Sequence, residues 1–185
     1  MKSIIFGSRG YLGSNLNQFL INNDIETCIY DSRNNEKLDL TEANNFKNIN
    51  WDVDNIYLMA GRTGTYKSFS NYDEFLKSNE LILLNILNSI RNTKYRPRII
   101  FPSTRLIYKG SDYLLKENSE KETKTLYAVN KLACENFLKA YSNTYSIPYT
   151  IIRISIPYGN MIGTNYSYGT IGNFISNAIQ DKITL

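Results

Sequence analysis

The stretch GSRGYLG at residues 7–13 decides the fold, because it directly follows the short apolar run KSIIF at residues 2–6. Its glycines are Gly7, Gly10 and Gly13, and the residues after it, LGSNLNQFLINN, carry apolar side chains at helical spacing. The pattern predicts a buried strand, a glycine turn and a helix. Such a turn directs backbone N–H groups and a helix N-terminus at a pyrophosphate. The stretch therefore predicts a nucleotide-binding turn, with a plain strand-to-helix turn as the alternative.

Two acidic residues further along support the nucleotide interpretation. The second predicted strand, ETCIYD at residues 26–31, ends in Asp31, where an acid can accept hydrogen bonds from the adenosine ribose. Asp39 follows at a place suited to the adenine amino group. An acid in a polar loop and a cap before a helix are the alternatives for these two residues. Arg9 and Arg33 leave the dinucleotide open, because a guanidinium attracts a 2′-phosphate whereas Asp31 repels one.

Strands and helices alternate along the whole chain. Apolar runs predict further strands at residues 53–61, 97–108 and 148–159. Helical spacing predicts helices from Thr41, over residues 75–92 and 125–145, and from about Ile171. Each parallel crossover needs a helix, so the predicted fold is α/β, a doubly wound parallel sheet of Rossmann type.

The sequence LYAVNK places Tyr127 and Lys131 on one face of a predicted helix, four residues apart. An ammonium group close to a tyrosine favours the phenolate, so Tyr127 is a candidate general base or acid at a sugar hydroxyl. Ser103 and Thr104 end a predicted strand and offer a hydroxyl to the same substrate oxygen. An aromatic contact beside a surface lysine, and polar capping of a loop, are the alternatives.

The composition excludes several classes of function. The 185 residues contain no histidine, which removes Ser-His-Asp and Cys-His catalysis and argues against a zinc site. The net charge of +4 is mild and the basic residues are scattered, so no nucleic-acid partner is expected. No apolar stretch is long enough to span a membrane. The short apolar start does not resemble a signal peptide, and two cysteines fit a cytoplasmic protein.

Eight motifs occur in the order of one known family: GSRGYLG, Asp31, Asp39-Leu40, LMAG, Asn79, PSTRLIY, YAVNK and RISIPYG. Together they resemble the extended short-chain dehydrogenase/reductase family, the NAD-dependent sugar-nucleotide epimerases and dehydratases. The resemblance extends over essentially the whole chain. It implies that Thr104, Tyr127 and Lys131 are catalytic, and that Ser103, Thr104 and Arg105 meet the substrate. With Arg9 and Arg33 included, the expected cofactor contacts are Gly7, Arg9, Gly10, Tyr11, Leu12, Gly13, Asp31, Arg33, Asp39, Leu40, Met59, Ala60, Gly61, Asn79, Tyr127, Lys131 and Pro157.

Departures from the family pattern narrow the reaction. Family members that are 4,6-dehydratases usually carry Asp-Glu after the catalytic threonine, where this chain has Arg105 and Leu106. The GDP-fucose synthase branch, which GSRGYLG and AGRTG also resemble, uses a Cys/His pair that a chain without histidine lacks. We therefore predict a nucleotide-sugar 4-epimerase with bound NAD, in surface-polysaccharide precursor synthesis. Its reaction needs neither the Asp-Glu pair nor the Cys/His pair. The alternatives are an NADPH-dependent 4-keto-sugar reductase and a nucleotide-binding homologue without turnover.

The family also suggests how the chain is organised. Residues 1–159 are expected to form the NAD(P)-binding domain with its catalytic Tyr/Lys pair. Residues 160–185 are expected to begin a smaller C-terminal lobe that binds the nucleotide-sugar, and the chain is expected to be a fragment of a longer protein. A homodimer is expected through the helices that hold Asn79 and Tyr127.

Overall fold

A computed structural model describes residues 1–32, 38–159 and 169–179. In this part of the chain, five strands form one sheet in the order β2-β1-β3-β4-β5, and every pair is parallel. The chain moves outward from β1 to β2 and then crosses to the other side of β1, so the order reverses between β1 and β3. The strands are β1 (Lys2–Phe6), β2 (Glu26–Tyr30), β3 (Asn55–Leu58), β4 (Arg98–Thr104) and β5 (Tyr149–Ile154).

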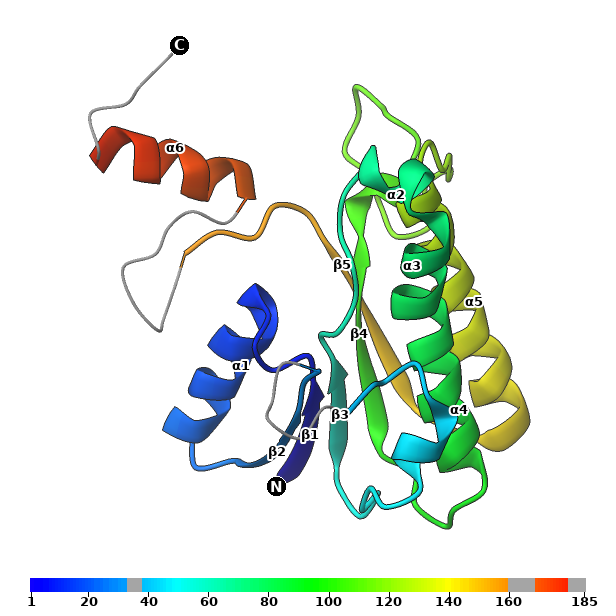
Figure 1. The fold of residues 1–185 in the computed structure, drawn as a ribbon. Helices are drawn as coiled ribbons and strands as arrows, with labels where there is room; N and C mark the ends of the chain where they lie inside the picture. Colours follow the sequence, from blue (N-terminus) through cyan, green and yellow to red (C-terminus); the bar gives the residue numbers. More distant parts are fainter. Residues whose placement is uncertain (33–37, 160–168, 180–185) are drawn as a thin grey trace.

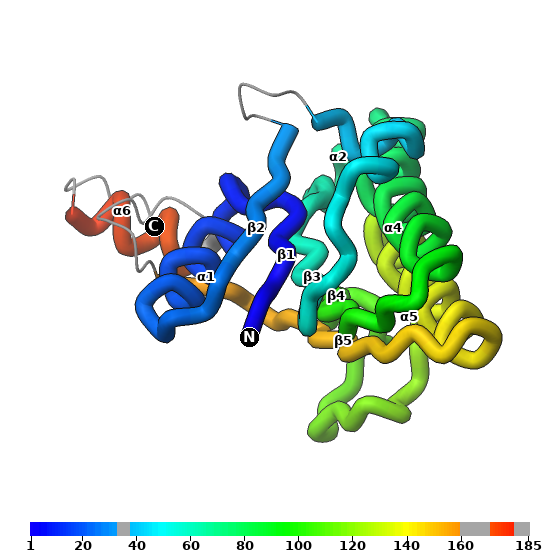
Figure 2. The backbone as a smooth tube through the Cα atoms, turned by 90° about the horizontal axis from the view of Figure 1, so that it is seen from below, coloured from blue at the N-terminus to red at the C-terminus, as the bar shows by residue number. Residues whose placement is uncertain are grey.

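Helices cover both faces of the sheet, which confirms the doubly wound prediction (Figures 1 and 2). On one face lies α1 (Tyr11–Asn22), and α6 (Gly169–Ile179) is on the same side. The other face carries α4 (Ile82–Arg91) and α5 (Leu126–Tyr145). The segments leading into α4 are α2 (Lys67–Ser70), α3 (Tyr72–Leu76) and the π-helical turn η2 (Lys77–Leu81). No helix among the described residues is long and apolar enough to cross a membrane.

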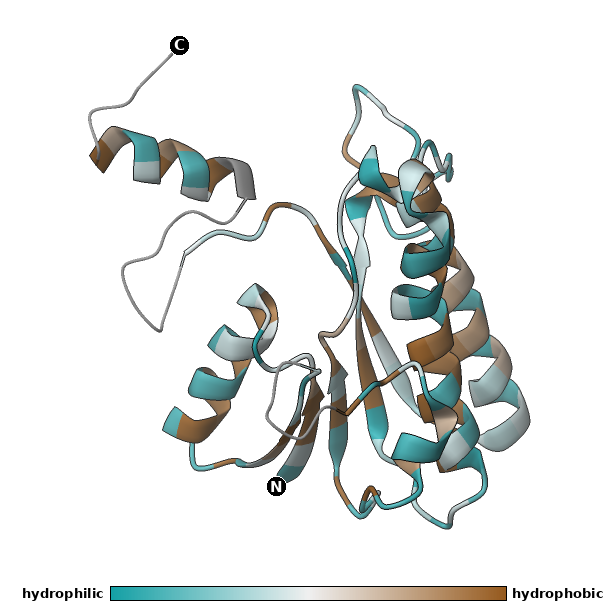
Figure 3. Cartoon of the chain, viewed as in Figure 1, coloured by the Kyte–Doolittle hydropathy of each residue, from teal (hydrophilic) through white to brown (hydrophobic). Residues whose placement is uncertain are grey.

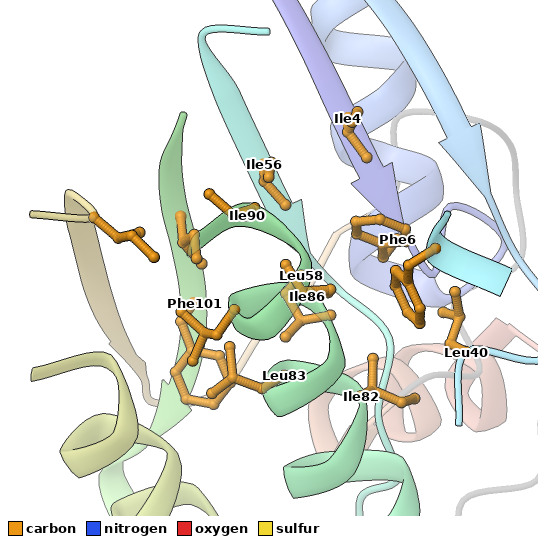
Figure 4. Close-up of a cluster of buried hydrophobic side chains, with 14 of the residues drawn as sticks. Ile4, Phe6, Leu40, Ile56, Leu58, Ile82, Leu83, Ile86, Ile90 and Phe101 are labelled. Carbon is orange, nitrogen blue, oxygen red and sulfur yellow. The ribbon is translucent and has the colours of Figure 1, made fainter. Parts of the chain in front are cut away.

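The main core lies between the sheet and the α4–α5 layer (Figures 3 and 4). Side chains alternate across a strand, so every second residue of β1, β3 and β4 points at α4. Among them Ile4, Phe6 and Phe101 are at most 1% exposed, and so are Leu83 and Ile86 of α4 that pack against them. This packing fixes the strand ends that build the site.

Two predicted helices differ from those observed. The helix expected from Thr41 is a single 3₁₀ turn, η1 (Ala43–Phe46). The Asp39 carboxylate accepts hydrogen bonds from the amide and the hydroxyl of Thr41, and Asn45 donates to the Asp39 carbonyl. Such local side-chain bonds compete with helix formation. The helix expected over residues 75–92 is present, but η2 interrupts it with one wide turn around Asn79.

Candidate active site

Two adjoining cavities lie at the carboxyl ends of β1, β3 and β4. The nucleotide cavity, of about 740 Å³, is lined by the glycine turn, Asp31 and Asp39. The catalytic cavity, of about 300 Å³, is lined by Thr104, Tyr127 and Lys131. The two cavities share six of their lining residues: Leu12, Met59, Ala60, Gly61, Arg62 and Thr63. They therefore form one cleft at the point where the strand order reverses, the usual ligand position in such sheets.

The glycines of the first turn are required by close backbone approach. Gly7 has φ +85°, and a Cβ there would lie 2.3 Å from the amide nitrogen of Ala60. A Cβ on Gly13 would lie 2.1 Å from the carbonyl oxygen of Gly7. Gly10 is the N-cap of α1 and supplies no capping side chain. The first N–H groups of a helix have no acceptor within it, so this turn fits a diphosphate without further change.

Asp31 is buried at the nucleotide cavity, 4% exposed, although it is an acid. Its Oδ2 accepts a hydrogen bond of 2.9 Å from the backbone amide of Arg9, which ties the acid to the glycine turn. Asp39 also lines this cavity, where its hydrogen bonds from Thr41 hold the pKa of its carboxyl below the ordinary value. Arg33 lies outside the described residues. The predicted cofactor contacts Arg9, Tyr11 and Leu40 line the same cavity.

Thr104 and Ser103 point in different directions from the end of β4. The Thr104 hydroxyl oxygen accepts a hydrogen bond from the Leu106 amide at 3.2 Å and starts the 3₁₀ turn η3 (Arg105–Ile107) beside the catalytic cavity. Ser103 contributes to the cavity wall, but its hydroxyl donates to the Glu135 carboxylate at 2.5 Å. Thr104 is therefore the better placed hydroxyl for a substrate oxygen.

Lys131 is buried beneath the catalytic cavity with an unusual set of neighbours. Its Nζ donates to the Pro102 carbonyl at 2.8 Å, and lies 4.5 Å from the Phe101 ring centre and 5.9 Å from that of Tyr127. None of the carboxylates in the described part of the chain forms an ion pair with it. Burial without a counter-charge lowers the pKa of Lys131 to about 8. The ammonium thus has a carbonyl and two aromatic rings as its partners.

Comparison with known proteins identifies the family. The model of the NAD dependent epimerase/dehydratase family matches residues 3–185. The chain belongs to this family.

Two curated proteins similar to this member of the epimerase/dehydratase family have names that describe epimerases. A putative UDP-glucose 4-epimerase of Methanocaldococcus jannaschii is 27% identical over 199 residues, covering 97% of this chain and 63% of that protein. A CDP-paratose 2-epimerase of Salmonella typhi is 22% identical, covering 98% and 65%. The chain therefore spans just under two thirds of the length of these relatives.

Solved structures agree on the fold. The UDP-glucose 4-epimerase of Thermus thermophilus, in complex with NAD, superposes with a TM-score of 0.84 at 18% identity, covering 100% of this chain and 64% of that one. A UDP-glucuronic acid 4-epimerase of Bacillus cereus, in complex with UDP-glucuronic acid and NAD, gives 0.75 at 19% identity, covering 98% and 64%. At these identities the likeness shows the Rossmann-type fold.

Asn79, expected as a structural or cofactor-side residue of the epimerase/dehydratase family, has a structural position. It is 2% exposed, and its amide side chain bonds both the backbone N–H and the carbonyl of Arg62, at 3.0 and 3.2 Å. A Cβ on the preceding Gly61, which has φ +149°, would lie 2.6 Å from the Asn79 Oδ1. Asn79 therefore fixes the loop after β3 that lines both cavities.

The loop after β5 closes the cleft from the other side. Pro157 lines the catalytic cavity. Two residues later, the Gly159 carbonyl accepts a hydrogen bond of 2.5 Å from the hydroxyl of Tyr11. This contact joins the loop to the helix that carries the glycine turn.

The sequence analysis did not predict an ion pair between α5 and β5, next to the end of β4. The Arg153 guanidinium bonds both carboxylate oxygens of Glu135, at 3.0 and 2.7 Å, and also the Tyr108 hydroxyl at 2.6 Å. These bonds, those to Glu135 first, raise the pKa of Arg153 above its ordinary value. Ser103 bonds the same carboxylate. The signal was an acid one turn after Lys131 on the predicted helix, and an arginine in the strand RISIPYG.

Proposed function

We propose that the protein is a nucleotide-sugar 4-epimerase that works through a transient 4-keto sugar with NAD. The observation that carries this proposal is the set of side chains that line the catalytic cavity. Among the described residues that line it, the ionisable side chains are those of Tyr127, Lys131 and Arg62, and no carboxylate is present. A 4-epimerase needs one proton acceptor, whereas dehydration needs a further acid and base.

The described residues also fit the cofactor. The first turn of α1 would hold the diphosphate, and Asp31 would accept hydrogen bonds from the adenosine ribose hydroxyls. The buried carboxylate opposes a 2′-phosphate, which favours NAD over NADP. Met59, Ala60 and Gly61 line the passage between the two cavities, and Pro157 lies beside the catalytic end.

The proposed mechanism uses three side chains. Tyr127 removes the proton of the sugar C4 hydroxyl, and the Thr104 hydroxyl donates a hydrogen bond to the same oxygen. NAD, when bound, would supply the chemistry of accepting a hydride from C4 and of returning it to the opposite face. The Lys131 ammonium stabilises the tyrosine phenolate, because an adjacent positive charge favours the ionised form. After the keto sugar has turned over, Tyr127 returns the proton to the oxygen.

We also propose that the protein is a cytoplasmic homodimer and that its product supplies surface-polysaccharide precursors. On the helices expected at a dimer interface, Leu87 of α4 is fully buried in the core, and Phe137 of α5 packs against that core. Val129 on α5 is 44% exposed, and Leu76 and Tyr72 on α3 are 49% and 66% exposed. An outer face of α3 and α5 with these side chains supports association of two copies.

The experiment that tests the function is the substitution Tyr127→Phe, with Tyr113→Phe as the matched control, since Tyr113 is 85% exposed on a surface loop. NAD content and the conversion of UDP-glucose to UDP-galactose are measured in all three proteins, with other nucleotide-sugars assayed in parallel. We expect Tyr127→Phe to lower turnover by about 100-fold or more while it retains NAD, and the control to match the parent. Net consumption of NADPH with a 4-keto sugar would indicate the reductase instead, and a protein that binds no dinucleotide would overturn both.

A further inference from the structure

A third cavity opens beside the catalytic cavity and is called the side pocket here. It measures about 250 Å³ and lies between η3 and the loop that follows it. Thr65 and Leu106 line both the side pocket and the catalytic cavity. A substrate held at Thr104 and Tyr127 therefore has room to extend a ring substituent into the side pocket.

Among the described residues, the wall of the side pocket carries one cation without a partner. Lys109 is paired with Glu120 at 3.0 Å, and Lys124 is paired with Glu122 at 3.3 Å. By contrast, the guanidinium of Arg105 has neither an ion pair nor a hydrogen bond within the described part of the chain. The pocket thus offers one uncompensated positive charge, next along the chain from Thr104.

The side pocket is held in shape by its surroundings. Tyr108 forms an isolated antiparallel bridge with Lys121, which closes the base of the loop. Arg153 donates to the Glu117 carbonyl at 2.7 Å and fastens the loop to the sheet. The Thr125 hydroxyl oxygen accepts from the Ala128 amide as the N-cap of α5, so its own proton can still be donated into the pocket. The site is therefore largely formed before a ligand arrives, which lowers the cost of binding.

We propose that the side pocket binds a carboxylate carried by the sugar of the substrate, so that Arg105 selects nucleotide-linked uronic acids over neutral sugars. A guanidinium presents parallel N–H groups that match the two oxygens of a carboxylate. The Thr125 hydroxyl adds a neutral donor, and Leu106 and Leu115 give an apolar wall for the ring carbons. This inference rests on the proposed function and adds the class of sugar to it.

The test compares the binding of UDP-glucuronic acid and UDP-glucose, and of the corresponding dTDP pair, to the NAD-loaded protein by calorimetry. We expect the acidic sugar to bind about tenfold more tightly, which corresponds to about 1.4 kcal/mol. Arg105→Gln should remove this preference, so that the acidic and the neutral sugar bind with Kd values within about twofold of each other. Arg105→Lys should retain only part of it, because an ammonium lacks the planar fork. Lys47→Gln, a change of equal charge at an exposed site away from the cleft, should behave as the parent.

Each other outcome counts against a named part of the argument. Equal binding of acidic and neutral sugars to the parent overturns the side pocket as a carboxylate site but leaves the epimerase proposal standing. A preference that survives Arg105→Gln overturns the assignment to Arg105. If Arg105→Gln weakens UDP alone as much as UDP-glucuronic acid, the guanidinium binds the diphosphate and the inference is wrong. If no nucleotide-sugar binds, the proposed function falls with it.

Discussion

Replacing Lys131 by methionine should make the fold more stable at neutral pH and remove catalysis. The Lys131 ammonium is buried with a carbonyl as its hydrogen-bond partner, and its pKa falls from 10.5 to about 8. A shift of this size means that the folded state carries a burial cost of about 3.4 kcal/mol at pH 7, at about 1.36 kcal/mol per pKa unit. Methionine has a similar length and no charge, so it avoids this cost but loses the bond to Pro102, worth about 1–3 kcal/mol.

The pH dependence separates these two contributions. Because the folded pKa of Lys131 is below the unfolded value, the unfolded chain binds more protons between pH 8 and 10.5, and stability rises with pH over that window. The cost of the charged lysine is fully present below pH 8 and falls to about 1.4 kcal/mol at pH 9.5. The lost hydrogen bond to Pro102 contributes equally at both values. The difference in unfolding free energy between parent and Lys131→Met should therefore change by about 2 kcal/mol between pH 7 and 9.5.

Urea denaturation of the cofactor-free proteins at the two pH values measures this difference. The other titrating groups are common to both proteins and cancel in the comparison. A difference that stays constant from pH 7 to 9.5 would refute the argument that burial sets the ionisation of Lys131. Turnover provides the second readout, since the variant should retain its fold but lose its activity.

Two further substitutions test the framework of the site. Gly13→Ala should destabilise the protein by about 3 kcal/mol or more, because its Cβ would meet the Gly7 carbonyl, whereas Gly110→Ala, whose Cβ would meet nothing within 4 Å, should leave the thermal midpoint unchanged. Glu135→Gln should cost about 2 kcal/mol in denaturant unfolding, because it leaves the Arg153 guanidinium without its counter-charge, and an unchanged midpoint would show that the pair contributes nothing.

The helix of the Tyr/Lys pair and the glycine turn could be predicted because they depend on local rules. LYAVNK sits in a helix from Leu126 to Tyr145, so the rule that residues four apart share a face brings Tyr127 and Lys131 together. Thr125 caps this helix, as its place before the apolar spacing suggests. The glycine turn could also be predicted from the sequence. Close backbone approach allows only glycine at residue 13, so the residue type itself marks the turn.

Side-chain direction was harder to predict, because it depends on partners from other parts of the chain. Ser103 and Thr104 are adjacent, and the two-residue period of a strand already implies that they cannot both face the substrate. Which of them does so is decided by Glu135, 32 residues away, which takes the Ser103 hydroxyl. In the same way, the side pocket depends on a loop whose closure at Lys121 leaves no periodic signal.

Pro102 shows how one residue that looks unsuited to its place explains the position of the catalytic cavity. Proline cannot donate to a sheet ladder, so a proline within a central strand argues against the strand. Here the pairing of β4 with β3 ends at Ile100, whereas its pairing with β5 continues to Thr104. At Pro102 the strand therefore needs bonds on one side only, and the missing N–H costs little. Because β3 has left the sheet at this level, a gap opens beside β4, and the Pro102 carbonyl, one residue from Ser103 and two from Thr104, is available to Lys131. The end of the β3 ladder thus creates both the catalytic cavity and the acceptor that fixes the lysine beneath it.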